Sequence, residues 1–281
     1  MYKICVVEQK YYKVIVPFWI KNNFLRNKEM NFNIVHKIKS KLQLLPTFIL
    51  MLLMLSLFST GCNEKPRYQV GNIIEFGSYY QDDLSRKTPI KWRVLEVKDG
   101  KALLISELLL DTQPYNKEFK EITWENSSIR HWLNNEFINE AFTQSEQNKI
   151  NLTYIYNNDN VKYGAKGGNN TQDKIFLLSL DEVNKYLPNE KQRAIKVTQY
   201  AIKQGAWVCD FDVCRENGFY GNGAWWLRSP VNYQNNAPGV DDYGFIIDIG
   251  YFVDIINFAV RPALFINWDA QNSHTASEQR E

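Results

Sequence analysis

The chain has 281 residues, of which 44% are hydrophobic and 23% charged, and this composition excludes a largely disordered protein. Its net charge of +2 is distributed unevenly along the chain. Residues 1–61 hold nine basic and two acidic side chains, which leaves 24 basic and 29 acidic ones, a net charge of −5, for residues 62–281. An acidic chain without a run of Lys or Arg gives no support to nucleic-acid binding.

An uncharged, mostly apolar stretch over residues 42–63 follows three lysines. A basic segment, an apolar segment and a small-residue exit form the order of a secretory signal. The exit, Ser-Thr-Gly-Cys at residues 59–62, resembles the bacterial lipoprotein signal, in which Cys62 receives the lipid. We therefore interpret residues 1–61 as a leader, with Met30 as a candidate true start. The alternative is an uncleaved membrane anchor, since about 20 apolar residues span a bilayer.

Either interpretation places the remaining chain outside the cytoplasm and at a membrane. Residues 62–69 are expected to be a tether, residues 70–268 a single globular domain and residues 269–281 a polar tail. A segment of this size can bury a core of its own.

The globular segment begins with strand patterns. Apolar runs predict strands over residues 73–77, 90–97 and 102–106. The Asp99-Gly100 pair between the last two is a strong hairpin signal.

The period then changes to that of helices. Apolar residues at 129, 132, 133, 137, 141 and 142 predict an amphipathic helix, with cap candidates at residues 126–128. Thr143 and Ser179 each precede a glutamate at capping-box spacing. A short helix over residues 198–204 should end at Gly205, and residues 157–173, rich in Asn and Gly, indicate a long loop.

Strand patterns return in the last third, at residues 225–228, 244–248, 251–255 and 260–267, with Gly250 as a candidate hairpin turn. Strands, then helices and loops, then strands again indicate an α+β fold and not a βαβ arrangement.

Several segments together resemble the bacterial domain of unknown function 6273 family. They span residues 68–268 in the expected order: Val70–Tyr79, Ile90–Leu95, Trp124 with Ile129–Asn134, Asp173–Ser179, Thr198–Ala201, Trp225–Pro230 and Val260–Leu264. The resemblance implies an extracytoplasmic domain with a C-type-lectin-like fold, in which the N- and C-terminal strands pair and two or more helices and long loops intervene. The name of the family states no activity.

Within that fold, WWLRSP at residues 225–230 would be a core strand of a second sheet, and VRPALFI at residues 260–266 the closing strand. Trp225 and Trp226 should point to opposite faces of the strand, one into the core and the other towards a helix or a surface groove. The alternative role for Trp226 is ligand contact. We interpret Trp225, Arg228, Arg261 and Trp132 as structural, with both guanidiniums held by carboxylates or carbonyls.

Cys209 and Cys214 can form a disulfide, remain free thiols or bind a metal. The implied fold is related to formylglycine-generating enzymes, which use a pair of cysteines, so an oxidase that uses Cys209 and Cys214 is the alternative function. Neighbouring carboxylates raise the pKa of a thiol, which opposes a reactive thiolate. Without another catalytic, metal or cofactor motif, we expect no enzyme, no metal and no cofactor.

The hypothesis that remains is a lipid-anchored binding module for a glycan or a protein. Loops at residues 157–173 and 231–243 carry Tyr and Asn, which are adaptable contact residues. The candidate ligand-binding residues are Tyr163, Tyr233, Tyr243, Trp226, Asp241 and Asp242. The acidic pair lacks the spacing of a calcium loop, so a solvated turn is the alternative for it.

Overall fold

A computed structural model of the chain describes residues 68–82 and 84–267. The predicted leader with Met30, the lipid-anchor candidate Cys62 and the polar tail lie outside these residues. Within the described ranges, no helix combines the length and the apolar character needed to cross a membrane.

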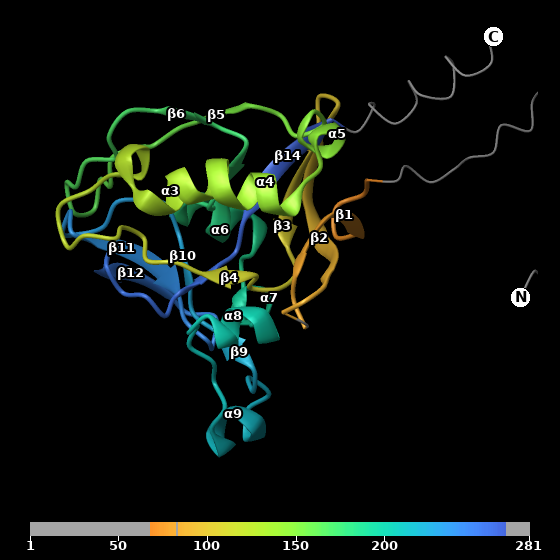
Figure 1. The fold of residues 1–281 in the computed structure, drawn as a ribbon. Coiled ribbons are helices and arrows are strands. Elements are labelled where there is room, and N and C mark those ends of the chain that lie inside the picture. Colours follow the sequence, from red (N-terminus) through yellow and green to blue (C-terminus); the bar gives the residue numbers. More distant parts are fainter. Residues whose placement is uncertain (1–67, 83, 268–281) are drawn as a thin grey trace, which may run out of the picture. The chain divides into compact units, whose positions relative to one another are not determined.

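The first sheet has five antiparallel strands in the order β1-β2-β3-β14-β7 (Figure 1). Their bounds are β1 Ile73–Tyr80, β2 Lys87–Lys98, β3 Lys101–Ser106, β14 Ala263–Asn267 and β7 Ile175–Phe176. The predicted hairpin is confirmed, since Lys98 pairs with Lys101 across Asp99 and Gly100, whose φ angles are 50° and 72°. Positive φ at both central residues is what a two-residue hairpin turn requires.

The C-terminal strand lies inside this sheet and not against the N-terminal strand. β14 pairs with β3 on one side and with β7 on the other, while β1 pairs with β2. The expected direct pairing of first and last strands is therefore wrong. The β2–β3 hairpin intervenes, because β3 pairs locally with β2 on one edge and with β14 on its other edge.

The second sheet has the order β12-β11-β10-β13-β4 (Figure 1). Its strands are β12 Ile246–Phe252, β11 Asn236–Val240, β10 Trp225–Trp226, β13 Ala259–Val260 and β4 Asp111–Thr112. The prediction that WWLRSP forms a core strand of a second sheet is confirmed, since β10 lies at the centre. The expected single strand at residues 260–267 is divided, because the chain leaves this sheet after Val260 and enters the first sheet at Ala263.

The hairpin expected at Gly250 is also wrong. β12 runs through this residue, which has a φ of 75°, and the register with β11 shifts between Ala237 and Gly239. Such a shift is a bulge, and here two extra residues of β12 are accommodated without a turn. A Cβ at Gly250 would lie 2.7 Å from Val231 Cγ2 and 2.8 Å from the Ala237 carbonyl oxygen, so only glycine fits.

The predicted amphipathic helix is confirmed as α3 Ser128–Trp132, a π-helical segment Leu133–Phe137 and α4 Ile138–Ala141. Its N-cap is Ser127, and the predicted capping boxes at Thr143 and Ser179 are present. The remaining helices and short ladders are a 3-10 turn Trp124–Asn126, α5 Gln144–Gln147, α6 Leu180–Tyr186, α7 Glu190–Arg193, α8 Gln199–Lys203, α9 Asp212–Glu216, β5 Thr153–Ile155, β6 Thr171–Asp173, β8 Ile195–Lys196 and β9 Asn222–Gly223.

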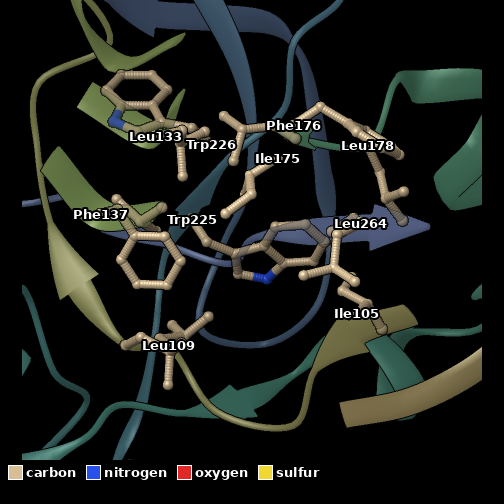
Figure 2. Close-up of a cluster of buried hydrophobic side chains, with 14 of the residues drawn as sticks. Ile105, Leu109, Leu133, Phe137, Ile175, Phe176, Leu178, Trp225, Trp226 and Leu264 are labelled. Carbon is tan, nitrogen blue, oxygen red and sulfur yellow. The ribbon is translucent and has the colours of Figure 1, made fainter. Parts of the chain in front are cut away.

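Both tryptophans of β10 are fully buried. Figure 2 shows Trp225 among side chains from both sheets and from the π-helical segment. The Trp226 ring packs 4.4 Å from that of Phe258, and its Nε1 donates to the Gln113 carbonyl at 2.9 Å. Trp225 therefore lies in the core, as a structural role requires. The Trp226 ring is likewise without exposed surface, so a ligand has no access to it in this structure.

Candidate functional site

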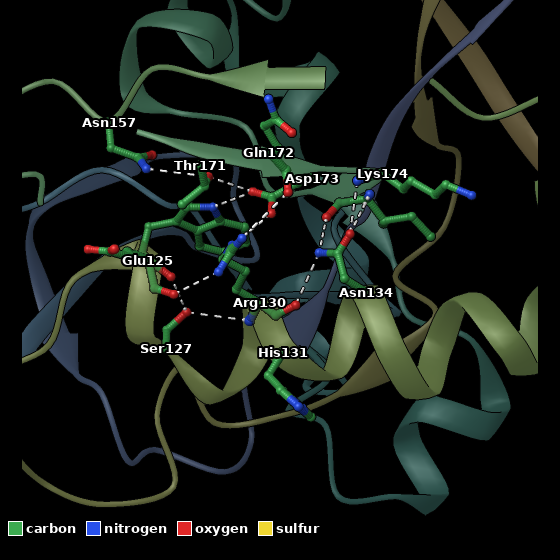
Figure 3. Close-up of polar contacts among 12 residues, drawn as sticks. Glu125, Ser127, Arg130, His131, Asn134, Asn157, Thr171, Gln172, Asp173 and Lys174 are labelled. Carbon is green, nitrogen blue, oxygen red and sulfur yellow. Dashed lines mark hydrogen bonds and ion pairs between the residues drawn. The ribbon is translucent and has the colours of Figure 1, made fainter. Parts of the chain in front are cut away.

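A buried carboxylate joins the amphipathic helix to the ladder at the end of the long loop (Figure 3). Asp173 accepts hydrogen bonds from Trp124 Nε1 at 2.9 Å, Arg130 Nε at 2.7 Å and Thr171 Oγ1 at 2.8 Å. Because an adjacent guanidinium compensates it, this buried charge is a stable part of the architecture.

Asn134 makes a second joint on the next turn of the helix (Figure 3). Its Oδ1 accepts from the backbone N–H groups of Lys174 and Ile175, and its Nδ2 donates to the Ile175 carbonyl. Together, Asp173 and Asn134 fix the strand that follows the loop at residues 157–170. The loop is therefore held at its end by two polar contacts to a helix.

Arg228 is held by a carboxylate and a carbonyl, as expected. Both of its terminal nitrogens bond the carboxylate of Glu182, and Nη1 also donates to the Leu177 carbonyl at 2.7 Å. Burial alone would raise the pKa of Glu182, but the hydrogen bond and the charge of Arg228 outweigh it and hold that pKa below its usual value. The sequence signal for this partner was the capping box that Glu182 forms with Ser179.

A pocket of about 230 Å³ opens beside this ion pair. We call it the Arg228 pocket, and its walls are residues 156–161, 179–181 and 228–230. The first wall belongs to the long loop, and the other two are the start of α6 and the end of the WWLRSP motif. The Asn160 side chain donates to the Pro230 carbonyl at 2.9 Å and so ties the loop to the motif.

Two residues that line this pocket also carry polar atoms without a hydrogen-bond partner among the described residues. They are Oδ1 of Asn157, an acceptor, and Nε of Arg228, a donor. Both residues are more than nine-tenths buried, and these two atoms have almost no exposed surface. Unmet donors and acceptors are costly in a protein interior, but a ligand in the pocket does not reach these atoms in this arrangement of side chains.

The rim of the Arg228 pocket carries an exposed ring and paired charges. Tyr156 is 64% exposed. Asp159 accepts a hydrogen bond from Lys166 Nζ at 2.8 Å, and this bond holds the pKa of Asp159 below its usual value. Arg228 is paired with Glu182 and Asp159 with Lys166. The third charged side chain in these walls, Asp181, forms no ion pair among the described residues.

The ligand-binding candidates from the sequence do not gather at this pocket. Tyr163 lies 3.5 Å from Asp248 through its hydroxyl, Tyr233 is 65% exposed, and the Tyr243 ring packs 4.8 Å from that of Phe219. The carboxylate of Asp241 accepts from two backbone N–H groups of its own turn, and the Asp242 carbonyl accepts from Asn222. Of the two predicted contact loops, only the first reaches the Arg228 pocket. Part of the second is the buried strand β11, whose Pro and Gly disguise it as a loop.

Cys209 and Cys214 are joined by a disulfide at the base of α9, a helix that projects from the rest of the domain (Figure 1). Both are buried. With a carboxylate oxygen of Asp242 they form the one group of three metal-type ligands within 4.8 Å in the described part of the chain. Both sulfurs are used in the disulfide. In this oxidised state the two cysteines are therefore neither free thiols nor metal ligands.

Arg261 is fully buried at the point where the chain changes sheets. The expectation that its guanidinium is held by carboxylates or carbonyls is met only in part: Nε donates to the Ser106 carbonyl at 3.1 Å, whereas Nη1 and Nη2 have no hydrogen-bond partner among the described residues. The guanidinium lies 4.9 Å from the centre of the Trp225 ring. Desolvation lowers the pKa of Arg261 to about 9, against the attraction of Glu107. Trp132 is half-buried, with its ring 5.3 Å from that of Phe137, in agreement with a structural role.

These observations define an α+β domain of largely antiparallel sheets in which a long loop forms one wall of a small polar pocket. By sequence, the chain belongs to the family described as Domain of unknown function (DUF6273), whose model matches residues 99–268. The resembling segments from Trp124 onward fall inside this match, and those at residues 70–79 and 90–95 precede it. No curated protein and no solved structure matches the chain.

Proposed function

We propose that this chain is a lipid-anchored, extracytoplasmic binding module and that its Arg228 pocket takes one unit of a neutral glycan. The observation that carries the proposal is the concave pocket itself, with the exposed ring of Tyr156 and the amide side chains of the long loop in its walls. A sugar hydroxyl both donates and accepts hydrogen bonds, so it can pair with an amide oxygen or an amide N–H group.

The charges of the pocket favour a neutral ligand. Arg228 and Asp159 each have a partner of opposite charge, and Asp181, which has none among the described residues, is exposed, so that solvent and salt screen its charge. Tyr156 adds an exposed aromatic face against which the C–H groups of a sugar ring can pack. A concave pocket of about 230 Å³ suits one small ring better than a protein partner, because protein interfaces are usually larger and flatter.

The anchor and the finer fold are part of the same proposal. Cys62, behind an apolar stretch, is the proposed site of lipid attachment, and its replacement by Ala should abolish incorporation of a labelled fatty acid. We propose a C-type-lectin-like architecture because the N- and C-terminal strands share one sheet and a second sheet is centred on β10.

The test compares two tyrosines of equal exposure. The full chain in detergent is applied to an array of neutral glycans, and the Kd of the best retained glycan is measured for the wild type, Tyr156→Ala and Tyr233→Ala. Tyr156, at 64% exposed, is part of the pocket, whereas Tyr233, at 65%, is not. We expect Tyr156→Ala to weaken binding about tenfold, or ~1.4 kcal/mol, and Tyr233→Ala to change it less than twofold.

Equal effects of the two substitutions, or retention of no glycan, would contradict the proposal. Turnover of a peptide thiol or amine that disappears in the Cys209→Ser, Cys214→Ser double variant would favour the oxidase alternative instead.

A further inference from the structure

A second cavity, of about 300 Å³, lies between the amphipathic helix, α8 and one edge strand of each sheet. We call it the Asp111 pocket, after the residue of β4 that lines it together with Tyr79 of β1, Tyr200 of α8 and Trp132, Glu136 and Glu140 of the helix. None of these residues borders the Arg228 pocket, so the two cavities are separate sites.

The carboxylate of Asp111 is buried without a cation. The residue is 5% exposed, and its oxygens accept from the Tyr79 hydroxyl at 2.5 Å and from the Thr112 N–H at 2.7 Å. Across residues 68–82 and 84–267, no Lys, Arg or His forms an ion pair with it. Desolvation raises the pKa of Asp111 to about 6, so the group is still mostly ionised at pH 7.5. Asp173, by contrast, has Arg130 as a partner.

The helix adds further negative charge to the same cavity. Glu140 is paired with Lys87 of β2 at 2.5 Å. Among the described residues, the one ion-pair partner of Glu136 is His131 at 3.8 Å, an exposed side chain on the same helix. Burial, followed by the charge of Asp111, raises the pKa of the Tyr200 hydroxyl, and Glu140 contributes to this shift. The local field therefore favours a positive ligand.

The remaining walls combine polar side chains (Thr112, Gln113 and Gln204) with aromatic ones. The rings of Tyr79 and Tyr200 meet edge to face at 5.6 Å, and Trp132 also borders the cavity. Aromatic faces attract organic cations and pack against their apolar stems. The carboxylates are spread around the cavity, because Asp111, Glu136 and Glu140 are not among the metal-type ligand groups that converge within 4.8 Å in the described ranges. This separation suits an extended organic cation and not a compact metal ion.

We propose that the Asp111 pocket binds an alkylammonium or alkylguanidinium group, with the cation at the Asp111 carboxylate and the stem against Trp132 and Tyr200. A ligand of this class supplies the buried carboxylate with the charge partner that the described residues do not provide, which removes the main electrostatic cost of the site. The inference does not depend on the glycan proposal, because neither pocket shares a residue with the other.

The test uses a charged probe and its neutral isostere. The full chain in detergent is titrated with 1,5-diaminopentane or with 1,5-pentanediol at pH 7.5 and constant ionic strength, and Kd is measured by calorimetry. We expect the diamine to bind at least tenfold more tightly than the diol. Asp111→Asn should weaken diamine binding at least tenfold, whereas Asp181→Asn, which removes a carboxylate from the other pocket, should leave it unchanged.

A second variant keeps the test decisive if Asp111→Asn fails to fold. Glu136→Gln changes a side chain that is 57% exposed and should weaken diamine binding two- to fivefold with an unchanged circular dichroism spectrum. Equal affinity for diamine and diol, or undiminished diamine affinity in both variants, would overturn the proposal. So would stronger thermal protection by 1 mM Ca²⁺ than by the diamine.

Discussion

The two pockets contain similar numbers of charged side chains and differ in how those charges are paired. In the Arg228 pocket, Arg228 and Asp159 each face an opposite charge, and Asp181, the carboxylate without an ion pair among the described residues, is exposed to solvent. In the Asp111 pocket, the hydrogen bonds of the central carboxylate are made, and its charge has no partner. The comparison teaches that the class of ligand is indicated by which charges and hydrogen-bonding groups lack a partner in the protein, and not by the residue types alone.

The largest expected loss of stability follows from removing one partner of the Arg228–Glu182 ion pair. Arg228→Ala leaves Glu182 partly buried without its cation, and breaking such a pair typically costs about 3–5 kcal/mol of unfolding free energy. Urea denaturation at pH 7.5 measures this loss. As a matched control, Lys185→Ala removes the exposed partner of Glu96 and should leave the midpoint unchanged within error. A loss for Arg228→Ala as small as that of the control would show that the pairing is unimportant.

The unpaired carboxylate of Asp111 should make the stability of the protein depend on pH. The pKa of Asp111 rises from 3.8 in the unfolded chain to about 6 in the folded one, so the folded state binds this proton more strongly. The resulting contribution to the free energy of unfolding is fully present below about pH 4 and is lost as the pH rises through about 6. The expected change is roughly 3 kcal/mol, from the shift of about two pKa units. The stability of the wild type relative to Asp111→Asn should therefore fall over this window. A difference that does not vary with pH would contradict the assignment.

An intermediate effect is expected from a feature that belongs to neither pocket. Replacing Cys209 and Cys214 by Ser opens a short covalent loop, which should remove about 2 kcal/mol of stability. Because neither cysteine lines a pocket, the affinities for glycan and for diamine should both remain within twofold of wild type. A selective loss of one affinity would show that α9 is coupled to that pocket.

The smallest expected effect sharpens the role of the hydrogen bonds at Asp111. Tyr79→Phe removes one donor to the carboxylate and should cost about 1.5 kcal/mol at pH 7.5. Since this bond lowers the pKa of Asp111, its loss should raise that pKa further. Diamine binding would then begin at a higher pH than in the wild type. Calorimetric titrations between pH 5 and 8 measure the shift, and an unchanged profile would contradict it.

Local features of this fold could be predicted from the sequence because they depend on near neighbours. The β2–β3 hairpin, the helix after Ser127 and the capping boxes at Thr143 and Ser179 each follow from spacings of a few residues. Strand order could not be predicted in this way, since the position of β14 between β3 and β7 depends on which distant edges are left unpaired.

The candidate sites were predicted only in part for the same reason. The long loop at residues 157–173 was singled out for its Asn content, and it does form one wall of the Arg228 pocket. The Asp111 pocket was missed because its walls come from four distant segments. The one signal in the sequence was the position of Asp111 itself, a lone carboxylate directly after Leu108-Leu109-Leu110.

The position of β14 between β3 and β7 also bears on the order in which this domain can fold. β14 is the last strand of the described residues along the sequence, and β13, which joins β10 to β4, directly precedes it. A nascent chain that reaches only as far as Phe258 lacks the strands that connect the parts of both sheets, although its local hairpins and helices can form. Folding of the whole domain therefore waits until residues 259–267 have been synthesised and can complete both sheets.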